Sequence, residues 1–102
     1  MGAQVALGDA GVDRDLDNVR NELDALDRQL VALLARRFEI GREAARLKRA
    51  LGIPVHDPAR EEQVILQARE WARTAGLPAD DVETLFRRMI DISRAAQLAS
   101  GP

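Results

Sequence analysis

The fold is decided by residues 16–51, which read LDNVRNELDALDRQLVALLARRFEIGREAARLKRAL without a proline. Apolar residues recur along this stretch in steps of three and four, with one gap, at Leu16, Val19, Leu23, Leu26, Leu30, Leu33, Ile40, Ala44, Leu47 and Leu51. This heptad pattern predicts one long α-helix with an apolar stripe that packs against another helix. Gly52 and the following Ile53-Pro54 should end the helix, and we expect it to begin near Asp13.

The predicted helix is too long for the fold of a single chain. At 1.5 Å per residue it would extend roughly 50 Å. A compact chain of this size has a radius of gyration of only about 13 Å, so the helix must bury its stripe against something outside its own fold. A second copy of the chain is the simplest candidate, and we expect an intertwined homodimeric helical bundle.

Two shorter helices are predicted after the first loop. Asp57 followed by Pro58 is typical of an N-cap with proline in the first turn. Apolar residues then keep a helical spacing up to Gly76, at Val64, Ile65, Ala68, Trp71 and Ala72, and we expect Trp71 to pack in the core or at the dimer seam. A third helix opens at Pro78, and its inner face should carry Val82, Leu85, Phe86, Met89, Ile90 and Ala96. The chain is therefore predicted to be all-α, with three helices.

The composition restricts both the domain organisation and the class of partner. With 102 residues, the chain is long enough for one small domain, which we place at residues 14–99 between a flexible N-terminal tail at 1–13 and a C-terminal tail at 100–102. A net charge of −2 gives no general attraction for nucleic acid or an anionic membrane, and no apolar run approaches the ~20 residues that span a bilayer. The absence of cysteine excludes thiolate metal sites and fits a reducing compartment, so we expect a cytoplasmic protein.

Arg37 interrupts the apolar stripe, at the position between Leu33 and Ile40 where an aliphatic residue is expected. A buried guanidinium is costly unless it is paired. Arg37 therefore either meets an anion, extends its head to solvent or sets the register of a coiled coil. Lys48 follows on nearly the same face of the helix, about 16 Å along its axis.

Polar residues also stand in or beside the two later helices where other types were expected. Ser93 and Gln97 continue the apolar stripe of the third helix with hydrogen-bonding side chains one turn apart. Asp57, Arg60 and Glu61 lie together at the start of the second helix. Taken alone, Ser93 and Gln97 are more typical of a fraying helix end, and the other three of helix capping with a surface ion pair.

Taken together, these departures suggest a binding site. A three-helix fold turns inward the positions of Arg37, Lys48, Arg60, Ser93 and Gln97. Their summed charge is positive, so a small anion with several oxygens is the natural ligand. Asp57 and Glu61 can hold hydroxyl groups, whereas His56 is expected in a solvated loop. Fixed donors and cations suit a reaction that depends on shape and charge stabilisation rather than on proton transfer.

From about Leu16 to Gln97 the chain resembles a known family, the all-helical chorismate mutases of the AroQ class. The matching motifs, in chain order, are Val19-Arg20, Leu26-Asp27, Leu33-Leu34-Ala35-Arg36-Arg37, Lys48, Asp57-Pro58-Ala59-Arg60-Glu61, Ile92-Ser93 and Gln97. The resemblance implies the Claisen rearrangement of chorismate to prephenate, in phenylalanine and tyrosine biosynthesis, with no cofactor and no metal.

The resemblance also implies roles for single residues. Lys48 and Gln97 would donate hydrogen bonds to the ether oxygen of the breaking bond, and together with Arg37 they are the expected catalytic residues. The substrate carboxylates would be bound or surrounded by Arg20, Arg37, Arg60 and Ser93. The ring hydroxyl would be held by the backbone of Asp57 and the carboxylate of Glu61.

Helix geometry adds an independent constraint on Arg20. It precedes Arg37 by seventeen residues on one continuous helix, hence by about 25 Å. One small substrate cannot reach both residues in the same chain. We therefore expect Arg20 to enter the active site of the other chain, which agrees with the interlocked dimer that the resemblance implies.

Three alternatives remain open. Two are enzymes on the same scaffold: an isochorismate-pyruvate lyase and a 4-amino-4-deoxychorismate mutase. The third is a non-catalytic helical dimerisation module, in which Arg37 sets the register and the other charges lie on the surface. The family also contains mutases activated by a partner enzyme of the same pathway, and the residues do not indicate whether this chain has one.

Overall fold

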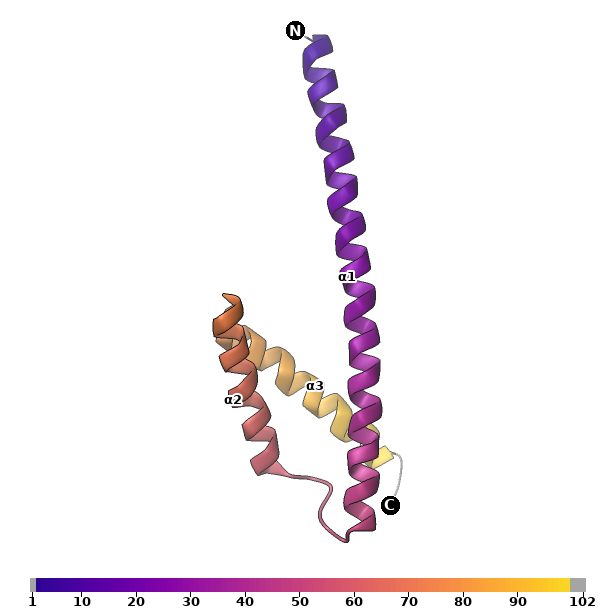
Figure 1. Ribbon diagram of the computed structural model, residues 1–102, viewed down its shortest axis with the longest axis vertical. Helices are drawn as coiled ribbons and strands as arrows, with labels where there is room; N and C mark the ends of the chain where they lie inside the picture. The colour runs from indigo at the N-terminus through magenta and orange to yellow at the C-terminus, as the bar shows by residue number, and fades with distance from the viewer. Residues whose placement is uncertain (1, 100–102) are drawn as a thin grey trace. The chain divides into compact units, whose positions relative to one another are not determined.

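The computed structural model describes the backbone of residues 2–99 and the side chains of residues 10–99. These residues form three α-helices: α1 at Gly2–Ala50, α2 at Pro58–Ala75 and α3 at Ala79–Ala99 (Figure 1). The described part of the chain contains no β-strand, so the predicted all-α class with three helices is confirmed. No helix in that part is long and apolar enough to cross a membrane.

Helix α1 begins at Gly2 rather than near Asp13, so the predicted start was wrong. The residues ahead of Asp13 include alanine, valine and leucine and no proline, so an established helix can propagate back through them. The flexibility of residues 1–13 stays a prediction. Met1 and the expected C-terminal tail at residues 100–102 lie outside the described residues.

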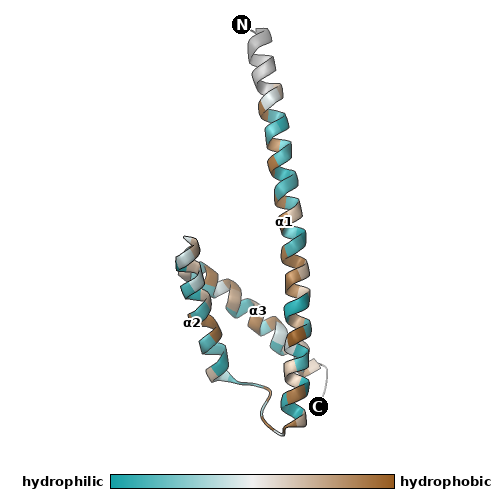
Figure 2. Cartoon of the chain, viewed as in Figure 1, coloured by the Kyte–Doolittle hydropathy of each residue, from teal (hydrophilic) through white to brown (hydrophobic). Residues whose placement is uncertain are grey.

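The chain divides into two compact units, residues 1–37 and 38–102, and each is described by itself. The first consists of the N-terminal part of α1, whose described residues carry the predicted apolar stripe (Figure 2). Leu23, Leu26 and Leu30 in this stripe are 54%, 54% and 57% exposed. The stripe therefore presents apolar side chains that the described chain leaves open to solvent.

The second unit contains the last turns of α1 together with α2 and α3. Its buried apolar residues are Ala45, Ile65, Ala68 and Ala72, and Ser93 is buried with them. Leu85 was predicted on the inner face of α3 but is 69% exposed, because it lies at the edge of the stripe that Ser93 centres. Trp71 was predicted either in the core or at the dimer seam. It is 61% exposed, so the core placement is wrong, and the placement at a dimer seam stays a prediction.

The predicted helix boundaries around α2 are confirmed. The side chain of Asp57 accepts a hydrogen bond from the backbone N–H of Arg60, and Pro58 occupies the first turn. Gly76 ends the helix with φ 75°, and its N–H donates to the carbonyls of Ala72 and Arg73. A positive φ is a conformation that glycine adopts without steric cost, which explains the residue type at this C-cap.

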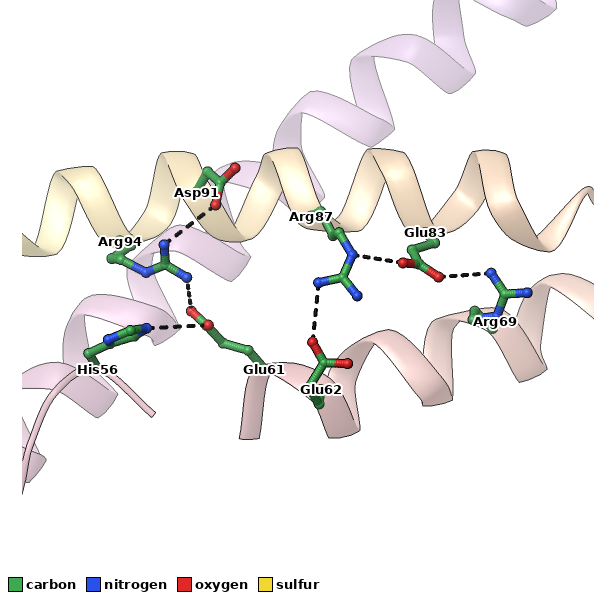
Figure 3. Close-up of polar contacts among 8 residues, drawn as sticks. All are labelled: His56, Glu61, Glu62, Arg69, Glu83, Arg87, Asp91 and Arg94. Atoms are coloured by element: carbon green, nitrogen blue, oxygen red, sulfur yellow. Dashed lines mark hydrogen bonds and ion pairs between the residues drawn. The ribbon is translucent and has the colours of Figure 1, made fainter. Parts of the chain in front are cut away.

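Ion pairs join α2 to α3 along one side of the hairpin (Figure 3). Arg69 lies 2.8 Å from both Asp80 and Glu83. Arg87 lies 2.7 Å from Glu83 and 3.3 Å from Glu62. Because Glu83 contacts both arginines, it links the two helices at the centre of this cluster.

Candidate active site

Ser93 and Gln97 lie against the backbone of α1. Ser93 is only 8% exposed, and the Gln97 amide nitrogen donates to its hydroxyl over 3.1 Å. The same nitrogen donates to the carbonyl of Gly41 over 3.3 Å. The amide is therefore held from both helices, which gives it a defined orientation.

Gly41 makes this approach possible. A Cβ at this position would lie 3.1 Å from the Ser93 hydroxyl oxygen and 3.2 Å from the Gln97 amide nitrogen. Both distances are shorter than ordinary van der Waals contact, so a side chain here would push α3 residues aside. The absence of a side chain at Gly41 thus allows Ser93 and Gln97 to lie against the backbone of α1.

Lys48 lies two turns after Gly41 on the same face of α1. It is half-buried, and its ammonium group donates to the carbonyl of Val55 over 3.4 Å. Its neighbour Arg49 donates to the carbonyl of Gln97 over 2.9 Å. The end of α1 is therefore tied both to α3 and to the loop before α2, and the Lys48 charge is directed into that loop.

Asp57 and Arg60 make local contacts at the start of α2. Asp57 caps the helix, accepting from the Arg60 N–H at 3.1 Å, while the exposed Arg60 guanidinium donates to Gln63 at 3.4 Å. These contacts match the capping explanation that the spacing favoured for the two residues alone. Their predicted roles toward a substrate stay predictions.

Glu61 stands between two nitrogen-bearing side chains (Figure 3). One carboxylate oxygen accepts a hydrogen bond from Arg94, and the other lies 3.5 Å from the Nε2 of His56. Arg94 also lies 3.5 Å from Asp91. The hydrogen bond to Glu61 raises the pKa of Arg94 further above its usual value, so this guanidinium stays charged at any physiological pH.

Arg20 and Arg37 belong to the first unit and are described within it. The Arg20 side chain is 65% exposed and lies 3.9 Å from Asp17. Arg37 is partly buried. Their meeting with the polar residues of the second unit stays a prediction.

Sequence reasoning missed two residues of this region, Gly41 and Arg94. Gly41 interrupts a strong helix-forming run, and a glycine there is itself a signal of close packing. Arg94 had no such signal, because its contact with Glu61 joins residues thirty-three positions apart on different helices. Only the packing of α2 against α3 brings them together.

The chemistry available in the second unit is hydrogen-bond donation to oxygen. The donors are the Lys48 ammonium group, the Ser93 hydroxyl and the Gln97 amide. The two N–H groups of the amide already donate to Gly41 and Ser93, so a ligand oxygen would replace one of these acceptors. Among the described residues, no group of three or more histidine, cysteine, aspartate or glutamate side chains is arranged to hold a metal ion. Such donors stabilise negative charge that develops on a bound oxygen.

Comparison with known proteins identifies relatives of several kinds. The T-protein of Haemophilus influenzae is 36% identical over 80 residues, which are 78% of this chain and 21% of that protein. The chorismate mutase of Methanocaldococcus jannaschii is 27% identical over 82 residues, covering 80% of this chain and 83% of that protein. The 4-amino-4-deoxychorismate mutase of Streptomyces venezuelae is 35% identical over 72 residues, covering 71% and 70%.

The extent of these matches differs between relatives. The chain spans about a fifth of the length of the T-proteins that it matches. No solved structure matches it significantly. A family model described as chorismate mutase type II matches residues 19–98, which hold most of α1 and nearly all of the two later helices. The chain belongs to the chorismate mutase type II family, the all-helical AroQ class.

Proposed function

We propose that this protein is a chorismate mutase that converts chorismate to prephenate, in the cytoplasmic pathway to phenylalanine and tyrosine. The reaction is an intramolecular rearrangement in which one carbon–oxygen bond breaks as one carbon–carbon bond forms. Because the two bond changes occur together within one molecule, the step needs neither a cofactor nor a nucleophile. The requirement is a shaped, charged environment that holds the reactive conformer.

The observation that carries this proposal is the fixed Gln97 amide. Its two N–H groups donate to the Gly41 carbonyl and to the Ser93 hydroxyl, and Gly41 lies two turns before Lys48 on the same face of α1. A substrate oxygen would accept from Gln97 in place of one of these two acceptors. In the reaction, negative charge develops on the ether oxygen. An amide and an ammonium group that are oriented before substrate arrives stabilise that charge more in the transition state than in the ground state.

The remaining roles in the proposal concern binding. Arg37 and Arg60, with Ser93, would hold the substrate carboxylates in one chain, and Arg20 would reach them from the second chain of a homodimer. Asp57 and Glu61 would hold the ring hydroxyl. The exposed apolar stripe of α1 supports the dimer, because it leaves large leucines such as Leu26 and Leu30 open to solvent.

The test follows the loss of chorismate ultraviolet absorbance, with phenylpyruvate detected after acid treatment to identify prephenate. Lys48→Ala should lower kcat/KM by roughly 100-fold or more, the usual effect of removing a transition-state donor. Arg46→Ala is the matched control, because Arg46 is an exposed cation of the same helix whose Nε donates to Glu43 over 3.0 Å. A well-folded dimer that leaves chorismate unchanged would disprove the proposal.

A second candidate is a mutase for 4-amino-4-deoxychorismate, favoured by the 35% identity to the Streptomyces venezuelae enzyme. The two substrates differ in one ring substituent, an amino group in place of the hydroxyl. Comparing kcat/KM for both, with isochorismate as a third substrate for the lyase alternative, separates the candidates.

A further inference from the structure

Arg94 is placed where it can influence which substituent the proposed substrate carries on its ring. Its guanidinium donates to Glu61 across the α2–α3 interface and lies 3.5 Å from Asp91 on its own helix (Figure 3). The Arg94 side chain is 35% exposed and that of Glu61 is 26% exposed, so both border solvent while being held in place. The cation therefore sits directly beside the carboxylate proposed to hold the ring substituent.

Glu61, Asp91 and Arg94 together carry one net negative charge. Glu61 and Asp91 each contribute one negative charge, and Arg94 contributes one positive charge. The imidazole ring of His56 also lies beside Glu61, with its Nε2 3.5 Å from the carboxylate. A ligand group that binds Glu61 therefore meets a carboxylate whose charge is partly offset by a guanidinium that Asp91 also contacts.

A hydroxyl group still binds well in this arrangement. A carboxylate has about four lone-pair sites, and Arg94 uses one of them, so acceptor capacity remains for a neutral O–H donor. An ammonium group bound to Glu61 would instead place a second positive charge next to Arg94, and the two cations would repel each other. An alkyl amine on a saturated ring carbon is mostly protonated at neutral pH, so the amino substrate carries this penalty and the hydroxyl substrate does not.

We propose that Arg94 is a specificity-determining residue that makes the site select a ring hydroxyl over a ring ammonium group. The inference rests on the proposed function, in which Glu61 holds that substituent. Arg94 acts through Glu61 and through its own charge, so it is a positioning residue rather than a catalytic one. Because the pair is partly exposed, the expected effect is moderate, about 3- to 10-fold in the ratio of the two kcat/KM values.

The chain offers a matched control for this residue. Arg87 lies two turns before Arg94 on α3 and lies 3.3 Å from Glu62, the residue next to Glu61 on α2. It also bridges the two helices, with Glu83 at 2.7 Å. Replacing Arg87 removes a comparable interhelical ion pair without changing the charge beside Glu61.

The experiment measures kcat/KM for chorismate and for 4-amino-4-deoxychorismate at neutral pH, with the full chain and its variants. The unaltered protein should favour chorismate. Arg94→Gln should shift the ratio toward the amino substrate, Arg94→Lys should keep the ratio near that of the unaltered protein because it keeps the charge, and Arg87→Gln should leave the ratio unchanged. Circular dichroism and thermal unfolding verify that each variant is folded.

Each contrary result has a distinct meaning. An unchanged ratio in Arg94→Gln, with chorismate still converted, overturns the inference and leaves the proposed function intact. An equal shift in Arg87→Gln also overturns it, because the effect would then come from the stability of the hairpin. If the unaltered protein prefers the amino substrate, the inference is wrong and the second candidate function is favoured. If neither substrate reacts, the proposed function and the inference fall together.

Discussion

At the scale of single residues, the polar contacts of Gly41, Ser93 and Gln97 were only partly visible in the sequence. The break in the apolar stripe of α3 pointed to Ser93 and Gln97, because helical periodicity identifies an inner face reliably. The partners of those side chains were not visible, since periodicity says nothing of what packs against a face. The contact of Arg94 with Glu61 was missed for the same reason, as it depends on the register between two helices.

Gly41→Ala separates stability from activity at this contact. Alanine favours helix over glycine by up to about 1 kcal/mol, but its Cβ would lie 3.2 Å from the Gln97 amide nitrogen and displace it. We expect kcat/KM for chorismate to fall roughly 10-fold or more while the melting temperature changes little. Enzyme kinetics and thermal unfolding of the same sample measure both.

Gly11→Ala is the control for this substitution. A Cβ at Gly11 meets nothing within 4 Å, so the helix gains stability and activity stays unchanged. Full activity in Gly41→Ala would show that the orientation of the Gln97 amide does not matter for the reaction.

At the scale of elements, local sequence signals located most helix ends. The Asp57-Pro58 cap and the Gly76 stop were predicted because each has a specific backbone requirement. The start of α1 was not predicted, because its first residues carry no capping signal and helix propagation has no sharp boundary there. The α2–α3 ion pairs were not predicted either. In the sequence alone, charged residues such as Glu83 and Arg69 cannot be told from ordinary surface residues, because their contact depends on how α2 packs against α3.

The stability of the α2–α3 hairpin should depend on pH through Glu83. Hydrogen bonds, first from Arg87 and then from Arg69, lower the pKa of this carboxyl below its ordinary value of 4.5. A carboxyl whose folded pKa is lowered stabilises the fold above the unfolded value and loses this contribution as the pH falls through the folded one. Glu83→Gln should therefore lower the melting temperature at neutral pH, and the difference from the unaltered protein should shrink as the pH falls below 4.5 and through the lowered pKa of Glu83.

Glu70→Gln is the control for the hairpin. Glu70 pairs within α2 alone, 3.4 Å from Arg73, so its loss should change the melting temperature much less at neutral pH. A difference for Glu83→Gln that persists at acid pH would mean that the carboxyl acts through packing rather than charge.

At the scale of the whole molecule, the described chain leaves its longest apolar stripe exposed. Leu26 and Leu30 are more than half exposed, at 54% and 57%. The length of the heptad pattern predicts this exposure, because one small domain cannot cover so long a helix. The heptad pattern does not say which chain supplies the helix that packs against this stripe. The homodimer is therefore a proposal with its own test.

Leu26→Asp should dissociate the proposed dimer, because it places a charge in the apolar seam. Sedimentation equilibrium of the unaltered protein should give a dimer, and the variant should give a monomer with a lower melting temperature. Asn21→Asp adds the same charge on about the opposite face of the helix and should leave the dimer intact. A monomeric unaltered protein would refute the homodimer directly.

The proposed contribution of Arg20 to the other chain's site can be tested by mixing two variants that are each expected to be inactive. Arg20→Ala and Lys48→Ala should each be inactive alone. In a mixed dimer, one site joins the intact Lys48 of the first variant to the intact Arg20 of the second, and the other site lacks both. Random re-association of equal amounts makes half of the dimers mixed, so activity should recover to about a quarter of the unaltered level.

Mixing Lys48→Ala with Gln97→Ala should restore nothing, because both residues belong to the same chain's site and every site would lack one of them. Recovery with Arg20→Ala and none with Gln97→Ala would place Arg20 across the dimer, whereas no recovery in either mixture, with mixed dimers present, would mean that Arg20 does not act in the other chain's site.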